Sequence, residues 1–217
     1  MLELYLTAPF YFLMSYKTVK NKATAEITVK KSKFIASIAP VSSVKDAKEF
    51  INKIKSKHNA ARHNVYAYRI FDGLDEKYSD DGEPSGTSGS AVLSVLKKQE
   101  IFDVVVVITR YFGGTLLGTG GLVSAYTKSF LDCLDKAEIV NAYPHKLVEM
   151  KLDYETYQII STICKNLNAK ILYNDFTDKI TLKIAIPNQN YQMFEDGVKQ
   201  IDGHLVEKIK DIYIKEN

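Results

Sequence analysis

Nine of the eleven glycines in the chain lie between Gly73 and Gly121, and all of these except Gly73 belong to two short loops. The first loop is Ser-Asp-Asp-Gly-Glu-Pro-Ser-Gly-Thr-Ser-Gly over 79–89, and the second is Arg-Tyr-Phe-Gly-Gly-Thr-Leu-Leu-Gly-Thr-Gly-Gly over 110–121. An amphipathic run follows each loop, so each is expected to open into a helix. The first turn of a helix carries backbone N–H groups without partners, which suit phosphate. The loops predict a site for phosphate or a nucleic-acid backbone, unless they are only tight turns that pack helices on a sheet.

The residues expected to contact such an anion are donors in the two loops and cations near them. They are Ser85 and Thr87 in the first loop, Arg110, Gly113, Gly114, Gly118, Gly120 and Gly121 in the second, and Lys31 and Lys33 in an upstream lysine-rich segment. The lysines equally fit a solvated strand edge that lysine protects from pairing. The forked guanidinium of Arg110 suits a phosphate or a loop carboxylate such as Asp81, so a bridge between the loops is the alternative.

Three acids of the first loop, Asp80, Asp81 and Glu83, offer the oxygen ligands that Mg²⁺ prefers, but the same residue types also stabilise turns. We therefore predict no metal, with Asp80 and Asp81 as the candidate ligands if one binds. If the protein is an enzyme, the catalytic candidates are these three acids and His63. No cofactor is predicted, because the second loop lacks both the Gly-Lys-Ser/Thr of a Walker A motif and the GxGxxG spacing.

The order of expected elements indicates an α+β chain with two domains. Strands are predicted over 25–30, 34–39, 63–71 and 103–109, and helices from Ser43 and over 89–98 and 121–137. The pattern breaks at residues 141–144, and a strand–helix–strand–strand–helix–strand order follows, which is that of a ferredoxin-like domain. We expect an N-terminal extension over 1–16, one domain over 17–140 and a ferredoxin-like domain over 145–217.

Charge and cysteine content limit the possible partners. Residues 1–144 contain 19 Lys and Arg against 15 Asp and Glu, whereas residues 145–217 contain 10 against 11. A weak preference for polyanions is therefore expected in the first part of the chain. The apolar run over 2–14 is too short to span a bilayer and lacks a basic signal-peptide start. Together with two cysteines that no motif pairs, this predicts a cytoplasmic protein without a membrane partner.

The loop sequences resemble the signature of the IMPACT/YigZ family over 79–89, 110–114 and 117–123, and the motifs Ser32-Lys-Phe34 and Ala61-Arg-His-Asn64 add to the resemblance. The resemblance implies an N-terminal α/β domain like the second domain of ribosomal protein S5 over about 18–137. It also implies a C-terminal domain like the ferredoxin-type modules of elongation factor G. The eukaryotic relatives regulate translation by competing for a partner of a stress-response kinase, but they have a different second domain.

These observations favour a non-enzymatic protein that regulates translation by binding RNA or the ribosome through the glycine-rich loops. A protein partner in translation control is a further expectation, and no DNA sequence specificity is expected. The alternative is an enzyme that acts on a phosphorylated small molecule or nucleotide, with Mg²⁺-dependent phosphate binding at the same loops.

Overall fold

The computed structural model describes residues 14–201 and 206–216. The chain is a mixed α+β protein with two sheets, and it divides into two compact units. Residues 16–141 form the N-terminal unit, and residues from 142 to 216 form the C-terminal unit, with which Met14 and Ser15 group. Most of the expected N-terminal extension, residues 1–13, lies outside the described residues. Tyr16 already starts a strand and is buried.

The N-terminal unit is built on a sheet with the strand order β2-β3-β6-β4-β5. The strands are β2 (Ala23–Val29), β3 (Ser32–Pro40), β6 (Val104–Tyr111), β4 (His63–Arg69) and β5 (Glu76–Ser79). All neighbours in this order are antiparallel. The sequence did not predict β5, because it is a short and mostly exposed edge strand that exists through its pairing with β4.

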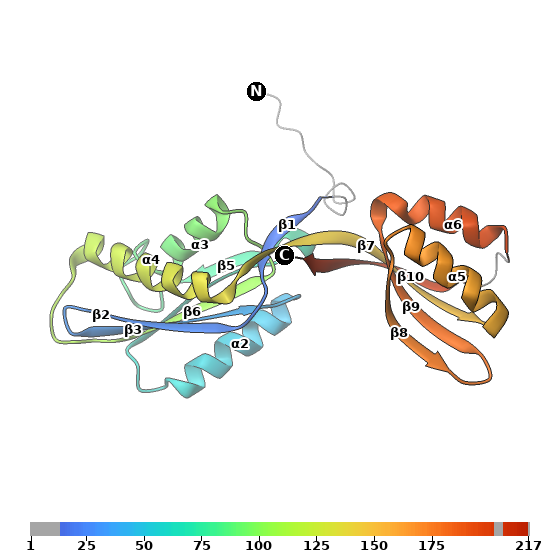
Figure 1. Cartoon of the computed structure of the whole chain (residues 1–217). Coiled ribbons are helices and arrows are strands. Elements are labelled where there is room, and N and C mark those ends of the chain that lie inside the picture. Colours follow the sequence, from blue (N-terminus) through green and yellow to red (C-terminus); the bar gives the residue numbers. More distant parts are fainter. Residues whose placement is uncertain (1–13, 202–205, 217) are drawn as a thin grey trace, which may run out of the picture. The chain divides into compact units, whose positions relative to one another are not determined.

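Helices cover both faces of this sheet. Helix α2 (Val44–Lys57) lies on one face, and α3 (Gly89–Lys98) and α4 (Gly118–Ala137) lie on the other (Figure 1). The apolar stripe of α2 packs on Val105 and Val107, while α3 and α4 pack on Val106 and Ile108. The run of β-branched residues in β6 predicted a strand buried on both faces, and this prediction is confirmed, because Val104 to Ile108 are fully buried.

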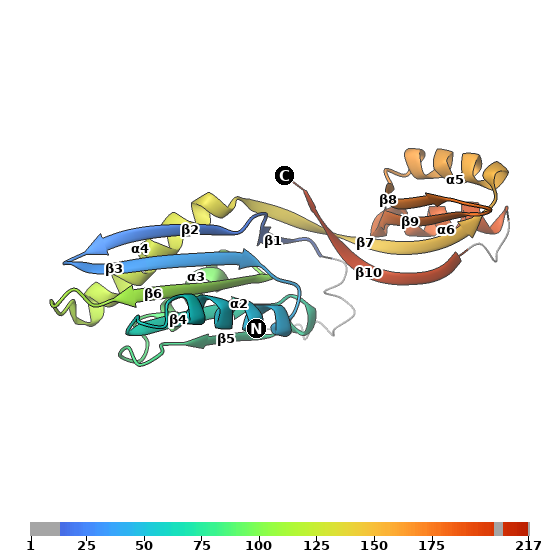
Figure 2. The ribbon, with the colours of Figure 1, turned by 90° about the horizontal axis from the view of Figure 1, so that it is seen from below.

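The turns at one end of the N-terminal unit bring distant segments together. The β2–β3 turn, the end of β6 and the start of α4 lie at the same end of the sheet in two perpendicular views (Figures 1 and 2). The antiparallel register explains this, because Arg110 near the end of β6 is opposite Phe34 on β3 and His63 on β4. Both glycine-rich loops therefore start from this end.

The C-terminal unit has the element order strand–helix–strand–strand–helix–strand. The elements are β7 (Ile139–Leu152), α5 (Tyr154–Asn166), β8 (Lys170–Phe176), β9 (Ile180–Pro187), α6 (Tyr191–Lys199) and β10 (Val206–Glu216). The strands lie in the order β10-β7-β9-β8, and β1 (Tyr16–Val19) also pairs with β7. Alternate residues of β9, Ile180, Leu182 and Ile184, are fully buried against the two helices. Short 3-10 turns occur at Asp72–Leu74 and Asn188–Asn190. Within the described residues, no helix is long and apolar enough to cross a membrane.

Candidate functional site

The two glycine-rich loops are joined at the side chain of Glu83, which is buried. Its Oε1 accepts one hydrogen bond of 2.7 Å from Nη1 of Arg110 and another of 2.7 Å from the hydroxyl of Tyr126. The Nε2 atom of His63 lies 3.9 Å from the same oxygen. Burial raises the pKa of Tyr126, and its hydrogen bond to Glu83 raises it further, so the phenol stays a donor. One carboxylate thus ties the first loop to β6, β4 and α4.

Arg110 is an internal cation and not an exposed one. Its side chain is 6% exposed, it lies 5.4 Å from the ring centre of Phe34 and 5.6 Å from that of Phe112, and its Nη2 donates to Ser32 Oγ at 3.4 Å. Its Nε is buried with no hydrogen-bond partner in the described part of the chain. The bridge between Arg110 and Asp81 that the sequence allowed is wrong, because the partner is Glu83. A phosphate that binds Nη1 of Arg110 must displace that carboxylate.

The carboxylate of Asp80 binds backbone N–H groups before and at the start of α3. Its carboxylate accepts hydrogen bonds from the backbone N–H groups of Gly86 (3.0 Å), Ser88 (3.3 Å) and Ser90 (3.3 Å), and from the Ser88 hydroxyl (2.8 Å). Burial alone would raise the pKa of Asp80, but these hydrogen bonds together lower it. The first loop therefore binds an anion that belongs to the protein itself, at the place where the sequence predicted an external one.

The side chain of Asp81 points away from the partners of Asp80. With φ of +45°, it directs Oδ2 to the backbone N–H of Asn64 (2.6 Å) and Oδ1 to Lys55 (3.2 Å). Its carbonyl oxygen lies 2.8 Å from Nδ1 of His63. A carbonyl can only accept, so Nδ1 carries the hydrogen and Nε2 is directed towards Glu83. Asp80 and Asp81 thus have different partners and share no common point for a cation. Within the described residues, no three His, Cys, Asp or Glu side chains are grouped as metal ligands would be.

The second loop packs its backbone directly on the β2–β3 turn. A Cβ atom added at Gly113 would lie 2.0 Å from the carbonyl carbon of Lys31, so only glycine fits there. The N–H of Gly113 also donates to Ser32 Oγ at 3.1 Å. The turn itself consists of Lys30 and Lys31, both exposed and both in the left-handed region, with φ of +43° and +65°. The close contact therefore fixes two lysines beside the loop.

The start of α4 remains open to solvent. Leu117 precedes the helix and makes no side-chain cap hydrogen bond, and Gly118, Thr119 and Gly120 are exposed. A pocket of about 350 Å³ lies beside this helix end. Its lining includes Arg62, His63, Glu83, Arg110, Phe112 and residues 116–119. We call the exposed part of this region the loop surface and define it as Lys30, Lys31, Arg62, Phe112 and residues 116–120.

The remaining predicted anion-binding residues differ in their exposure and in their partners. Ser85 is exposed, and Thr87 is buried with its hydroxyl donated to the Pro84 carbonyl at 2.7 Å. Lys33 forms an ion pair of 2.8 Å with Glu26. Gly114 and Gly121 belong to the second loop and the first turn of α4, respectively.

Neither cysteine is placed to react. Cys133 and Cys164 are both free and buried, and burial raises the pKa of each thiol to about 11. A thiol with such a pKa is a poor nucleophile at neutral pH.

Sequence reasoning did not include four residues that belong to the site. Tyr126 was expected only as part of the apolar side of a helix, although a phenol there needs a hydrogen-bond partner. Lys30 was seen only as one member of the lysine-rich segment. Arg62 and Phe112 could have been found as a cation and an aromatic residue close to the loops. In the structure the guanidinium carbon of Arg62 lies 5.7 Å from the ring centre of Phe112.

Comparison with known proteins places these loops in a family. The family model described as "Impact N-terminal domain" matches residues 30–134. An "IMPACT family member" of Haemophilus influenzae is 32% identical over 92% of this chain and 99% of its own length. The "IMPACT family member YvyE" of Bacillus subtilis is 45% identical over 65% of this chain and 66% of its own. A crystal structure titled as that of a hypothetical protein is 28% identical, with a TM-score of 0.64, covering 94% of this chain and 98% of the other.

Proposed function

The chain belongs to the IMPACT family, and from this premise we propose that it is a non-enzymatic regulator of translation that binds RNA, free or in the ribosome, through the loop surface. The link to translation comes from the family resemblance, since the eukaryotic relatives regulate translation. The choice of RNA comes from the chemistry of the loop surface. A cytoplasmic location and a protein partner in translation control are parts of the same proposal.

The observation that carries the proposal is the pair of lysines in the β2–β3 turn. A two-residue hairpin turn with positive φ at both positions favours Asn-Gly, because other side chains are strained there. Lys30 and Lys31 occupy both positions and are exposed, so their presence lowers stability without improving packing. Strained residues of this kind concentrate at functional sites. Two ammonium groups held beside a glycine loop suit the phosphates of a nucleic-acid backbone.

The other residues of the loop surface also offer groups that suit RNA. Lys30, Lys31 and Arg62 form no ion pair with a carboxylate within the described residues, so their charge is available to a ligand. The uncapped start of α4 offers backbone N–H groups to a phosphate. Phe112 is 40% exposed beside Arg62 and offers a face on which a base can stack. Single-stranded RNA combines both needs, phosphate contacts and stacking.

We also propose two finer assignments of fold. We take the N-terminal unit as an α/β domain like the second domain of ribosomal protein S5. We take the C-terminal unit as ferredoxin-like, and its element order together with the strand order β10-β7-β9-β8 supports this assignment.

The test replaces the turn by its favoured sequence in the full chain. The double variant Lys30→Asn/Lys31→Gly relieves the backbone strain, so the protein should become more stable by about 1 kcal/mol. Its affinity for a fluorescent single-stranded RNA should nevertheless fall, and the slope of log K against log salt should become shallower by about 1.4, since each single-strand phosphate contact contributes roughly 0.7. Because stability rises, a loss of binding cannot result from unfolding.

Lys98→Gln is the matched control, because Lys98 is an exposed lysine in the last turn of α3, at the other end of that helix from the loop. RNA binding should be nearly unchanged in this variant. Equal losses in the control and the double variant, or an unchanged salt slope in the double variant, would reject the loop surface as the RNA site.

The enzymatic alternative keeps one favourable observation. His63 lines the 350 Å³ pocket with its Nδ1 fixed by a carbonyl, which is how a proton-transferring histidine is oriented. The Mg²⁺ that this reading needs has less support, because the carboxylates of Asp80 and Asp81 are already bound by amides and by Lys55. Thermal stabilisation that requires both a nucleotide and Mg²⁺ would favour the enzyme over the RNA-binding protein.

A further inference from the structure

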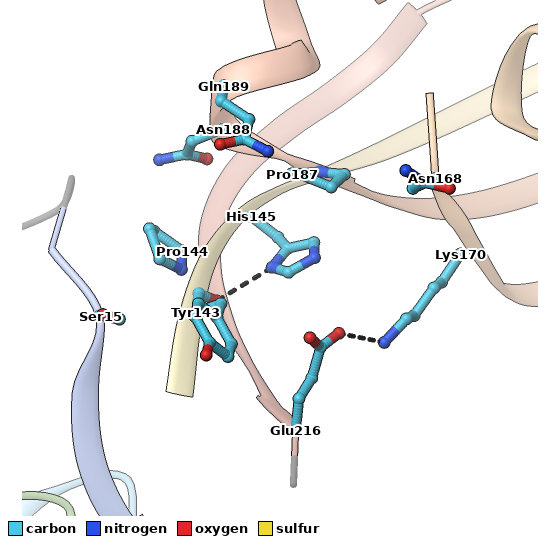
Figure 3. A pocket seen from close by; sticks show the side chains of 10 residues that line it. All are labelled: Ser15, Tyr143, Pro144, His145, Asn168, Lys170, Pro187, Asn188, Gln189 and Glu216. Atoms are coloured by element: carbon cyan, nitrogen blue, oxygen red, sulfur yellow. Dashed lines mark hydrogen bonds and ion pairs between the residues drawn. The ribbon is translucent and has the colours of Figure 1, made fainter. Parts of the chain in front are cut away.

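The C-terminal unit contains a second pocket that is unrelated to the glycine-rich loops. Its volume is about 550 Å³, which lies in the range of small-molecule sites. The lining comes from β7, from Asn168 and the start of β8, from the end of β9 and the 3-10 turn after it, from the end of β10 and from Ser15. Figure 3 shows these side chains around one space. Several chain segments thus converge on a concave region that presents polar side chains together with apolar surface.

His145 is a buried polar side chain that lines this pocket. The residue is only 3% exposed, and its Nδ1 lies 2.9 Å from the carbonyl oxygen of Tyr143, so Nδ1 carries the hydrogen. Nε2 makes no hydrogen bond within the described part of the chain, and His145 lines the pocket. Figure 3 shows this second nitrogen directed away from Tyr143, towards the space between Asn168 and Lys170. A fixed imidazole therefore offers an unused nitrogen to a ligand.

An ion pair at the edge of the pocket supplies a cation that a ligand can take over. Lys170, which starts β8, is paired with Glu216 at the end of β10 (Figure 3). The hydrogen bond from Lys170 holds the pKa of Glu216 below its usual range, so Glu216 is ionised and competes for the ammonium group. Both side chains are more than a third exposed, and such exposed pairs add little net stability. A ligand anion can therefore displace Glu216 at small cost.

The charges and the shape define the class of ligand. Glu216 is the one acidic residue in the described lining and is already paired, so a cationic ligand has no free carboxylate there. A phosphate monoester has oxygens that accept from Lys170 and, when it carries one proton, an O–H that can donate to Nε2 of His145. The volume leaves room for an organic part beside the amides of Asn168 and Gln189 and the ring of Pro144.

We propose that this pocket binds a small phosphorylated ligand, with its phosphate between His145 and Lys170 in the place of the Glu216 carboxylate. The site is separate from the loop surface and does not depend on RNA binding. Glu216 acts as an internal competitor, so the two partners of one ion pair have opposite effects on affinity. This opposite sign distinguishes a built site from a general attraction of phosphate to lysines.

The experiment titrates the full-length protein with inorganic phosphate and follows the ring resonances of His145 by NMR. Binding should be saturable, Lys170→Gln should weaken it about tenfold, and Glu216→Gln should strengthen it several-fold. Both substitutions are at exposed positions, so folding should be retained. Lys151→Gln is the matched control, since Lys151 is an exposed lysine of the same unit paired with Glu207, and it should change nothing.

Any of four results would overturn the proposal. One is the absence of saturable shifts at His145, and another is equal weakening by Lys151→Gln and Lys170→Gln. The third is weakening by Glu216→Gln, because removal of a competitor can only help the ligand. Acetate, which lacks the O–H, should shift the His145 resonances much less than phosphate, and equal binding of the two would reject the phosphate assignment.

Discussion

Replacement of Glu83 by glutamine tests whether the two loops are held by one buried carboxylate. Glutamine has nearly the same shape, but the change removes the only negative charge that contacts the buried Arg110 guanidinium within the described residues. Removal of one partner from a buried pair destabilises by about 3–5 kcal/mol, because the other charge stays buried without compensation. For a unit of this size (residues 16–141), that corresponds to a fall in melting temperature of roughly 10–20 °C.

The assay is urea unfolding followed by far-UV circular dichroism, with Glu83→Gln, Arg110→Met and the double variant compared in a cycle. Arg110→Met alone also leaves a buried charge unpaired, whereas the double variant leaves none. The double variant should therefore be more stable than the sum of the single changes predicts, by about 2 kcal/mol or more. A loss below about 1 kcal/mol for Glu83→Gln, or additive changes in the cycle, would show that the pair is solvated and that the loops are held by something else.

Three further substitutions test the local geometry. Asp80→Asn should destabilise the protein by about 1 kcal/mol at pH 7, because the carboxylate caps α3. The folded-state pKa of Asp80 is lowered from 3.8, so the carboxylate stabilises the fold above pH 3.8 and this stabilisation is lost as the pH falls through the lowered value. The difference in free energy of unfolding between Asp80→Asn and the parent protein, measured with urea, should therefore shrink below pH 3.8. A constant difference would contradict the cap. Gly113→Ala should cost about 3 kcal/mol, because its Cβ would lie 2.0 Å from the Lys31 carbonyl carbon. Gly120→Ala should be neutral or slightly stabilising by thermal unfolding, because its new methyl would meet no atom within 4 Å apart from its chain neighbours and the backbone of its own helix. Equal effects of the two glycine changes would contradict the close packing.

The sequence was sufficient for the elements that are fixed by local pattern. The strand β6 appears in the sequence as a continuous β-branched run and the helix α2 as an apolar stripe with helical periodicity, each within one segment, and both are present. β5 was missed because its four residues show no such pattern and are held by pairing with β4. The helix α4 was expected from Gly121 and begins at Gly118, because the glycines that suggested a loop also fit its exposed first turn.

The partner of Arg110 was not predictable from spacing. Asp80, Asp81 and Glu83 lie within four residues, and the turn sends each carboxylate to a different place. The turn geometry depends on φ of +45° at Asp81 and on the backbone contacts of the strands on either side. A single sequence shows that acids and a cation are near each other in the chain, but the direction of each side chain is set by the folded loop.

The site therefore has two physically separate parts, the residues that hold the glycine-rich loops together and the β2–β3 turn beside them, and we infer that stability and binding depend on different residues. Asp80, Glu83 and Arg110 bind each other or the backbone and are partly or fully shielded from solvent. Lys30 and Lys31 stay exposed, in a conformation that favours glycine and asparagine. Changes to the first group should lower stability and with it every activity. Changes at the turn should do the reverse, raising stability while weakening RNA binding. A variant that separates the two properties in this direction would be difficult to explain if the loops were only packing devices.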